Sequence, residues 1–381
     1  MKRTMPIFLL ATTACVATAQ QRELTLVETA RFGSIDGPVT LTRVGDILHA
    51  PDGRVYVTQP VDAIIRVFTV DGRLLTTIGG RGSGPGEFNL IDRIAWYRDS
   101  LAVHDPAQQC ITLLAADGGM RTIGEVPASV TGSRFASLPV ALLHDGSALV
   151  VPAKRFDTVL NLVPLVRVDA SLEQRLDDVA TISRNATRYH LRLPGGGRVT
   201  SENPAPRGSL WAAHPFGAGT AVLEQPADPG PEPAELRIRR FAEDGRTLFD
   251  RTLRHVATPI APVDRDRLID DIADQWTRQL RTVGRTQDAE AVHEAVAEVL
   301  DLPSYWPAAD RLLVGTDGSV WFRRQGPSAD RIWEVLGPDG ALIGQVRVPP
   351  NVELHQVSLE TVWASTLAQD DVPVVVRYDV R

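Results

Sequence analysis

The feature that most constrains the fold is a unit of four short strands that recurs along the chain. Residues 44–79 read VGDILHAPDG, RVYVTQP, AIIRVFTVDG and RLLTTIG, and residues 91–124 repeat the same order about 47 residues later. Each piece is a run rich in β-branched residues that ends at a turn signal such as Asp52–Gly53. A four-stranded antiparallel unit with this period is typical of one blade of a β-propeller.

Weaker copies of the unit bring the number of predicted blades to six. They occupy residues 138–183, 209–253, 309–348 and 352–380, and the last copy lacks one strand. Residues 24–33, LTLVETARFG, resemble the fourth-strand segment RLLTTIGGRG and are expected to supply that strand. We therefore predict an all-β, six-bladed propeller over residues 20–381, in which the segment from Leu24 to Phe32 pairs beside Val374 to Tyr378. Closure of this kind removes exposed sheet edges.

The glycine-rich stretch GGRGSGPGEF, from Gly79 to Phe88, lies between two predicted blades. A phosphate-binding loop would end in Gly-Lys-Ser/Thr, and a dinucleotide-binding loop would precede a helix, whereas this stretch has no lysine and precedes a strand. A flexible linker does not fit either, because ordered blades flank the stretch on both sides. We interpret it as a connection whose glycines allow close backbone approach, and in which Phe88 buries its ring between neighbouring blades.

This junction, followed by a first strand and by VYV and RVFTVDG in the blade before it, resembles the NHL repeat. Only the junction between the first two blades carries the motif clearly; RFGSIDGP and TIGEVPAS are worn copies. The resemblance implies a six-bladed NHL-like propeller. That family includes binding scaffolds and a few enzymes, so the resemblance implies a fold more firmly than a chemistry.

Residues 264–302 break the strand pattern and are expected to form a helical hairpin between blades four and five. Leu268, Ile272, Trp276 and Leu280 recur every four residues, and Val292, Val296 and Val299 with Leu300 form a second stripe. The two apolar stripes are expected to pack on the rim of the propeller. The alternatives are a cap over the central channel and a protein-docking surface.

The first 19 residues are predicted to be a signal peptide. Lys2 and Arg3 precede an apolar stretch, and Ala17 to Ala19 form a small-residue cleavage site before Gln20. The expected location is therefore secreted or periplasmic, with a lipoprotein anchored at Cys15 as the alternative. After cleavage, Cys110 is the only cysteine and no intramolecular disulfide can form.

Charge and hydropathy limit the classes of partner. Loss of Lys2 and Arg3 changes the formal charge from −7 to −9, which disfavours nucleic acid and anionic membranes as partners. No later stretch is long and apolar enough for a transmembrane helix.

Two charged pairs stand at equivalent positions where first strands begin, and first strands line the channel of a propeller. Asp92–Arg93 and Asp310–Arg311 each begin seven residues before a strand-ending aspartate. Two carboxylates near the channel mouth could bind a cation or a basic group. Alternatively, each aspartate accepts hydrogen bonds from loop amides or pairs with a neighbouring arginine.

Aromatic residues give a second indication of the ligand side. Tyr305–Trp306 lies between the helical insertion and blade five, and aromatic rings at a concave mouth can stack on sugars or apolar ligands. Trp96 and Trp211 are expected either to do the same or to pack between blades.

The histidines and serines give no clear catalytic signal. Histidines on or near first strands differ in their position along the strand, so a shared metal site is not predicted; these are His49, His144, His214 and His355. The serines show no nucleophile elbow.

The sequence thus predicts an exported ligand-binding or protein-interaction module without a cofactor. Its expected ligand residues are Asp92, Arg93, Asp310, Arg311, Tyr305 and Trp306, and its expected ligand is a small molecule, a glycan or a protein on the channel side. The alternative is a metal-dependent lyase or lactonase with a carboxylate and histidine cluster in the channel.

Overall fold

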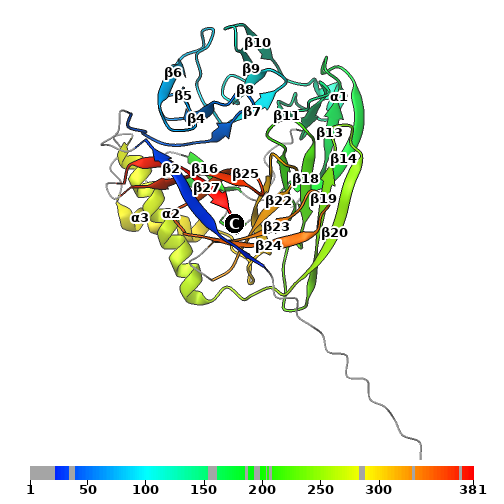
Figure 1. Cartoon of the computed structure of the whole chain (residues 1–381). Coiled ribbons are helices and arrows are strands. Elements are labelled where there is room, and N and C mark those ends of the chain that lie inside the picture. Colours follow the sequence, from blue (N-terminus) through cyan, green and yellow to red (C-terminus); the bar gives the residue numbers. More distant parts are fainter. Residues whose placement is uncertain are drawn as a thin grey trace, which may run out of the picture.

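Figure 1 shows the protein as a computed structural model. The structure describes residues 22–33, 39–152, 161–184, 188–192, 198–202, 204–205, 208–282, 288–327, 331–368 and 371–381. The predicted signal peptide (1–19) and Cys15 lie outside the described residues.

Six four-stranded antiparallel sheets form the blades of a propeller (Figure 1), as the repeat predicts. Blade one contains β3 (Ile47–His49), β4 (Val55–Gln59), β5 (Ile64–Phe68) and β6 (Leu74–Gly79); blade two contains β7 (Arg93–Tyr97), β8 (Ser100–Asp105), β9 (Cys110–Ala115) and β10 (Met120–Ile123); blade three contains β11 (Pro139–Leu142), β12 (Ala148–Val150), β13 (Asn161–Val168) and β14 (Arg175–Arg184). A short helix, α1 (Ala128–Thr131), lies between blades two and three.

The second half of the chain follows the same order. Blade four contains β17 (Leu210–Ala213), β18 (Thr220–Glu224), β19 (Ala234–Phe241) and β20 (Thr247–His255); blade five contains β21 (Ala309–Val314), β22 (Val320–Arg324), β23 (Arg331–Leu336) and β24 (Leu342–Val348); blade six contains β25 (Glu353–Val357), β26 (Thr361–Leu367) and β27 (Pro373–Val380). The first strand of each blade is its innermost strand. We call the face where these strands begin the mouth face, and the face where they end the turn face.

The two ends of the described chain complete the ring. Strand β2 (Leu26–Phe32) pairs antiparallel with β27, and Phe32 lies opposite Val375. This confirms the predicted closure of blade six. An unexpected addition is β1 (Glu23–Leu24), which pairs parallel with β24 at the outer edge of blade five. The N-terminal segment therefore ties two neighbouring blades together.

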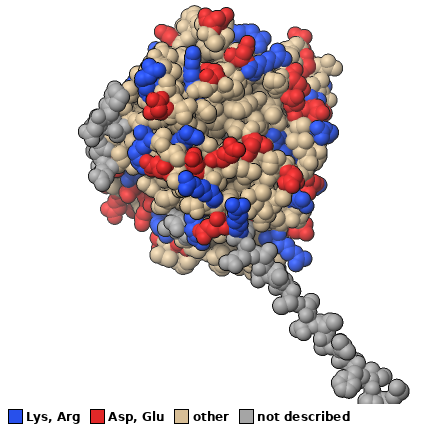
Figure 2. All heavy atoms as spheres, viewed as in Figure 1, with Lys and Arg blue, Asp and Glu red and all other residues tan. Residues whose placement is uncertain are grey.

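Burial follows strand order within a blade. The second strands, such as β4 and β8, are buried along their whole length because neighbouring blades cover both of their faces. In the outer strand β6, buried and exposed side chains do not alternate clearly, and most of the residues are exposed. Lys and Arg are interspersed with Asp and Glu on the face in Figure 2, and no helix in the described part of the chain has the length and apolarity needed to cross a bilayer.

The glycine-rich junction packs as expected. Phe88 is 1 % exposed and contacts the apolar core between blades one and two. Gly79 has φ +95°, and a Cβ there would lie 2.8 Å from the Phe88 ring and 2.9 Å from the Ala63 carbonyl oxygen. Glycine is required because the chain turns tightly against its own aromatic anchor.

Two insertions on the mouth face form a separate small core. Helices α2 (Pro262–Thr282) and α3 (Ala289–Val299) join blades four and five, and the hairpin of β15 (Arg188–Arg192) and β16 (Arg198–Glu202) joins blades three and four. The apolar stripes of the helices pack on each other and on Leu191 and Ala205 of the hairpin segment. The sequence pattern did not reveal this hairpin, which covers the stripes that were expected to pack on the rim.

A loop of blade four crosses the channel near the turn face. We call residues His214–Gly219 the plug loop. The Pro215 carbonyl oxygen accepts a hydrogen bond from the Trp96 amide of blade two (2.8 Å), and the Gly217 oxygen accepts one from the His144 amide of blade three (3.0 Å). Phe216 packs against the core between blades one and two. The loop thus links blade four to its neighbour, blade three, and to blade two, which is not its neighbour.

Two buried side chains, those of Arg240 and His214, hold the plug loop through hydrogen bonds. Arg240 is 2 % exposed and donates hydrogen bonds to the carbonyl oxygens of Ala218 (2.8 Å) and Thr220 (3.2 Å). Nδ1 of His214 accepts a hydrogen bond from the Phe216 amide (3.0 Å), and its Nε2 lies 3.3 Å from the Thr316 oxygen. Burial, together with the nearby Arg240 charge, lowers the pKa of His214 to about 4.

We expect ring closure to contribute strongly to stability. The ring centre of Phe32 lies 4.9 Å from that of Phe68 and 6.4 Å from that of Trp363. Phe32→Ala therefore removes an aromatic anchor where the two ends of the propeller meet. The free energy of unfolding should fall by about 2–4 kcal/mol in urea denaturation. On the same strand, Arg31 pairs with Glu28 at the surface, and Arg31→Ala should change the free energy of unfolding by about 0.5 kcal/mol or less. Equal effects of the two variants would contradict the role given to closure.

The plug loop should make stability depend on pH. His214 is neutral in the folded protein down to about pH 4, whereas an unfolded histidine binds a proton below its ordinary pKa of 6.5. The stability that this residue contributes is therefore complete above pH 6.5 and is lost as the pH falls from 6.5 to 4, by an amount on the order of 3 kcal/mol.

His214→Asn keeps an acceptor for the Phe216 amide but does not titrate. Its free energy of unfolding, measured in urea at a series of pH values, should fall less steeply than that of the natural protein between pH 6.5 and 4. The control is His293→Asn, which removes an exposed histidine beside Asp270. A slope unchanged in His214→Asn would show that protonation of this ring does not oppose folding.

Candidate functional site at the channel mouth

Charged side chains gather where the innermost strands of four blades begin. We call this set the mouth belt; it consists of Asp46, Asp92, Arg93, Asp310, Arg311, Arg323, Arg331, Glu353 and His355. Asp46 precedes β3 and Asp92 precedes β7, whereas Arg311 and Glu353 lie on β21 and β25. Because the first strands run parallel around the axis, their starts all lie at the mouth face.

Bulges in three innermost strands shape the mouth. The pairing register shifts at Val140 in β11, at Asp310 in β21 and at His355 in β25, so each of these residues is left without a cross-strand partner. A bulge re-aims the side chain or backbone of the extra residue and is common beside binding sites. Two of these three residues belong to the mouth belt, and the third accepts a hydrogen bond from it.

Asp92 and Arg93 form one side of the mouth belt. Arg93 Nε donates to Asp92 Oδ2 (3.1 Å), and Nδ1 of His104 lies 3.3 Å from the same oxygen. Contact with His104, together with the Arg93 charge, lowers the pKa of Asp92 to about 2, so this carboxylate is ionised at any physiological pH.

The Arg93 side chain reaches past its own blade. Its Nη1 donates to the Val140 carbonyl oxygen of blade three (3.2 Å), and its guanidinium carbon lies 6.0 Å from the centre of the Trp211 ring of blade four. A guanidinium at this distance from an indole face is attracted to it. One arginine therefore connects three blades across the mouth.

Asp310 and Arg311 are adjacent in sequence but have different partners. Asp310 accepts two hydrogen bonds from Arg323, from Nε to Oδ1 (2.7 Å) and from Nη2 to Oδ2 (2.9 Å). Arg311 instead pairs with Glu353 of blade six. The carboxylate of Asp310 is thereby neutralised by a paired arginine, which was the alternative considered from the sequence.

Glu353 is the centre of an arginine cluster. Besides Arg311 it contacts Arg331, and Arg323 Nη1 lies 3.7 Å from its Oε2. Burial lowers the pKa of Arg331 to about 10, and the charges of Arg323 and Arg311 act in the same direction. Arg331 remains protonated at neutral pH.

Asp46 and His355 join blades six, one and two. Asp46 Oδ2 accepts a hydrogen bond from the Ile94 amide (3.1 Å), and its Oδ1 lies 3.8 Å from His355 Nδ1. His355 Nε2 lies 2.8 Å from the Ser365 hydroxyl oxygen. Burial lowers the pKa of His355, so this ring is neutral at pH 7.

The structure separates the two charged pairs that the sequence aligned. Blades two and five stand opposite each other in a ring of six, so Asp92–Arg93 and Asp310–Arg311 lie on opposite sides of the channel. Tyr305 and Trp306 lie in the neck of the helical insertion, where the Trp306 amide donates to the Thr258 oxygen (2.8 Å). Trp306 is 3 % exposed, so its ring packs within this neck rather than facing an open groove.

Sequence reasoning missed most partners of the mouth belt. Arg323, Arg331 and Glu353 lie on three different strands, and only the fold brings them together. Asp46 left a usable signal, because aligning the first two blades places it with Asp92 directly before the first strand.

The mouth belt offers donors and acceptors in balance. It contains four carboxylates and four guanidinium groups, so no single sign of charge dominates. The ring centre of His49 lies 5.6 Å from that of Trp363, and His214 belongs to the plug loop near the turn face. These histidines therefore do not converge with His355. In the part of the chain that the structure describes, no group of three or more His, Cys, Asp or Glu side chains is placed to hold a metal ion.

Comparison with known proteins finds likeness to solved structures only. No protein-family model matches the sequence, and no curated protein matches it. A protein from Bacteroides fragilis that bears the name "putative exported protein" is similar in structure, with 12 % identity, a TM-score of 0.47, and coverage of 94 % of this chain and 95 % of that one. A DUF4221 family member from Bacteroides vulgatus has 10 % identity, a TM-score of 0.48, and coverage of 95 % and 99 %. A streptogramin B lyase has 11 % identity, a TM-score of 0.41, and coverage of 93 % and 98 %.

Proposed function

We propose that this protein is an exported binding module whose mouth belt holds a neutral, polyhydroxylated ligand such as a glycan. The observation that carries the proposal is the balance of four carboxylates and four guanidinium groups around the mouth. Guanidinium groups only donate hydrogen bonds and carboxylates only accept them. Equal numbers of donor and acceptor groups suit hydroxyl groups, which do both.

Partial exposure makes the mouth belt available to a ligand. The side chains of Asp92 and Arg93 are 44 % and 42 % exposed, and those of Arg311 and Glu353 are 36 % and 29 % exposed. These groups are already fixed by one another, so little side-chain entropy is lost when a ligand binds. Trp211 beside Arg93 adds an aromatic surface of the kind that packs against sugar rings.

We also propose that the propeller is NHL-like and that the protein is exported. The NHL-like reading is supported by the junction from Gly79 to Phe88, whose phenylalanine is buried between the first two blades. Export is supported by the basic start, apolar stretch and small-residue site of residues 1–19. A ligand presented outside the cytoplasm agrees with a glycan.

The metal-dependent lyase or lactonase alternative needs a set of metal ligands. The described residues provide no such set, and the carboxylate and imidazole groups of the mouth belt are engaged by arginines, backbone amides and a serine. Nothing in the described geometry favours this alternative over binding.

Binding should depend on the Asp92–Arg93 pair. We expect Asp92→Asn and Arg93→Gln each to weaken binding of the neutral sugars that a glycan array identifies by at least about tenfold, or ~1.4 kcal/mol, in isothermal titration calorimetry. Each substitution removes a charge and leaves the opposite charge of the mouth belt without its partner.

The matched control is an equally exposed pair on the outer strand β2. Glu28 and Arg31 have side chains that are 40 % and 42 % exposed, and Glu28→Gln and Arg31→Gln should leave sugar affinity unchanged. Failure of every neutral sugar to bind would contradict the ligand class. A stoichiometric divalent ion in the purified protein that is lost in Asp92→Asn would instead favour the enzyme alternative.

A further inference from the structure

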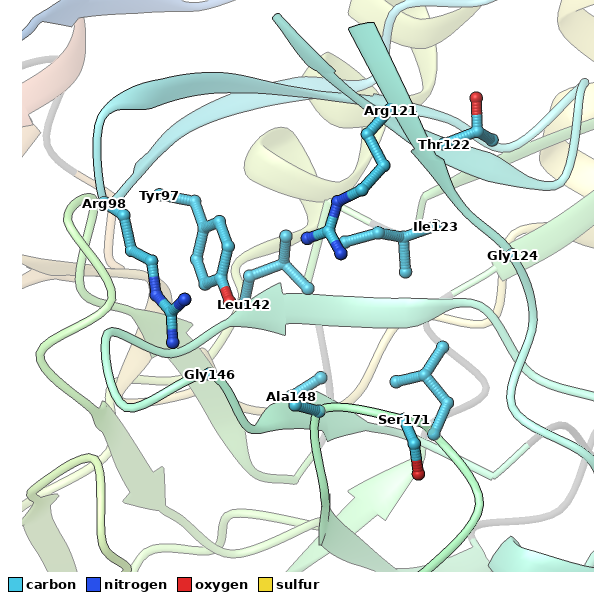
Figure 3. Close-up of a pocket in the computed structure, with 12 residues that line it drawn as sticks. Tyr97, Arg98, Arg121, Thr122, Ile123, Gly124, Leu142, Gly146, Ala148 and Ser171 are labelled. Carbon is cyan, nitrogen blue, oxygen red and sulfur yellow. The ribbon is translucent and has the colours of Figure 1, made fainter. Parts of the chain in front are cut away.

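A cleft on the turn face separates blades two and three (Figure 3) and lies apart from the mouth belt. Its volume is about 300 Å³. The turn between β7 and β8, the end of the outer strand β10, and two turns of blade three line it. These segments meet only because the two blades are neighbours.

Two arginines, one from a turn and one from a strand, line this cleft. Arg98 belongs to the turn after β7, and Arg121 belongs to β10; both line the cleft, and in the view of Figure 3 the Tyr97 ring lies between their guanidinium groups. Neither forms an ion pair with a carboxylate in the described ranges. This contrasts with the mouth belt, where each guanidinium has a carboxylate partner.

The fold holds Arg98 in place. Its backbone has φ +57°, a left-handed conformation that is uncommon for a residue other than glycine and that clusters at functional sites. Its guanidinium lies 5.3 Å from the centre of the Tyr97 ring. A Cβ on Gly146 would come 2.8 Å from Arg98 Nη2, so glycine in the facing turn of blade three leaves the space that the guanidinium occupies.

The rest of the lining combines polar side chains such as Thr122 and Ser171 with apolar ones. Leu142 and Ala148 of blade three are buried, and Ile123 of blade two is partly buried. The nearby carboxylate of Asp169 accepts hydrogen bonds from Ser171 and from the backbone amides of Glu173 and Gln174, so it is engaged within its own turn.

We propose that this cleft binds a small organic anion. A carboxylate or phosphate group would contact the guanidinium groups of Arg98 and Arg121, whose planar forks suit both groups, and an apolar body would pack on the partly buried Ile123. The assignment is independent of the mouth belt, because the cleft opens on the other face of the ring.

The test uses phenyl phosphate and benzoate as probes, with benzyl alcohol as the uncharged analogue. Isothermal titration calorimetry should detect binding of at least one anion and none of the alcohol, and the preferred anion identifies the headgroup. Arg98→Gln and Arg121→Gln should each weaken binding by about tenfold or more.

A pair of glycine variants distinguishes displacement of Arg98 from general backbone strain. Gly146 and Gly53 occupy equivalent turns between first and second strands, with φ +99° and +78°, but nothing lies within 4 Å of a Cβ on Gly53. Both alanine variants strain the backbone, and only Gly146→Ala displaces Arg98. We expect Gly146→Ala to weaken anion binding several-fold and Gly53→Ala to leave it unchanged. Absence of anion binding to the natural protein, equal effects of the glycine variants, or full binding by Arg98→Gln would each overturn the proposal.

Discussion

The hydrogen bonds between β2 and β27 close the ring, and the rest of the structure depends on them. Without that pairing, blade six would have three strands and an open edge. Strand β1 continues from β2 onto the edge of blade five, so a single N-terminal segment fixes the angle between the last two blades. The mouth belt needs that angle, because Arg311 of blade five must reach Glu353 of blade six.

The two ends of the channel differ in chemistry. Near the turn face, the plug loop bonds to blades two and three through backbone groups, and a buried Arg240 satisfies the carbonyl oxygens of the loop. At the mouth face, the charges are paired with each other and remain partly exposed. A ligand that approaches along the axis from the mouth face therefore meets an ordered polar ring rather than an open pore.

The repeat in the sequence predicted the blades because each blade is local. Turn signals such as Asp52–Gly53 and the aromatic anchor Phe88 act within one or two neighbouring blades, so their spacing carries the information. The closing strand was predictable for the same reason, since it is a displaced copy of the fourth strand. The β15–β16 hairpin was not, because it is no copy of the repeating unit and its apolar partners lie on helices about 80 to 110 residues away.

The candidate site shows the same limit more sharply. Asp92–Arg93 and Asp310–Arg311 are identical in sequence, and each aspartate contacts the residue opposite its arginine on the second strand, His104 or Arg323. The arginines differ, because Arg93 also pairs with Asp92 whereas Arg311 pairs with Glu353 of the next blade. The partner of Arg311 comes from the neighbouring blade, so the sequence of one blade does not show it. Which carboxylate meets which arginine is decided by strand register and by the neighbouring blade.

Pairing of charge is what distinguishes the two surfaces to which we assign ligands. In the mouth belt, each guanidinium is partly neutralised by a carboxylate, so a bound anion would have to compete with Glu353 or Asp310 for the same donors. In the cleft between blades two and three, the Arg98 guanidinium lies over the Tyr97 ring and next to Gly146, and its donors remain free of carboxylates in the described structure. An anion should therefore prefer the cleft even though the mouth belt carries more arginines, because affinity follows the number of unpaired donors rather than the number of charges.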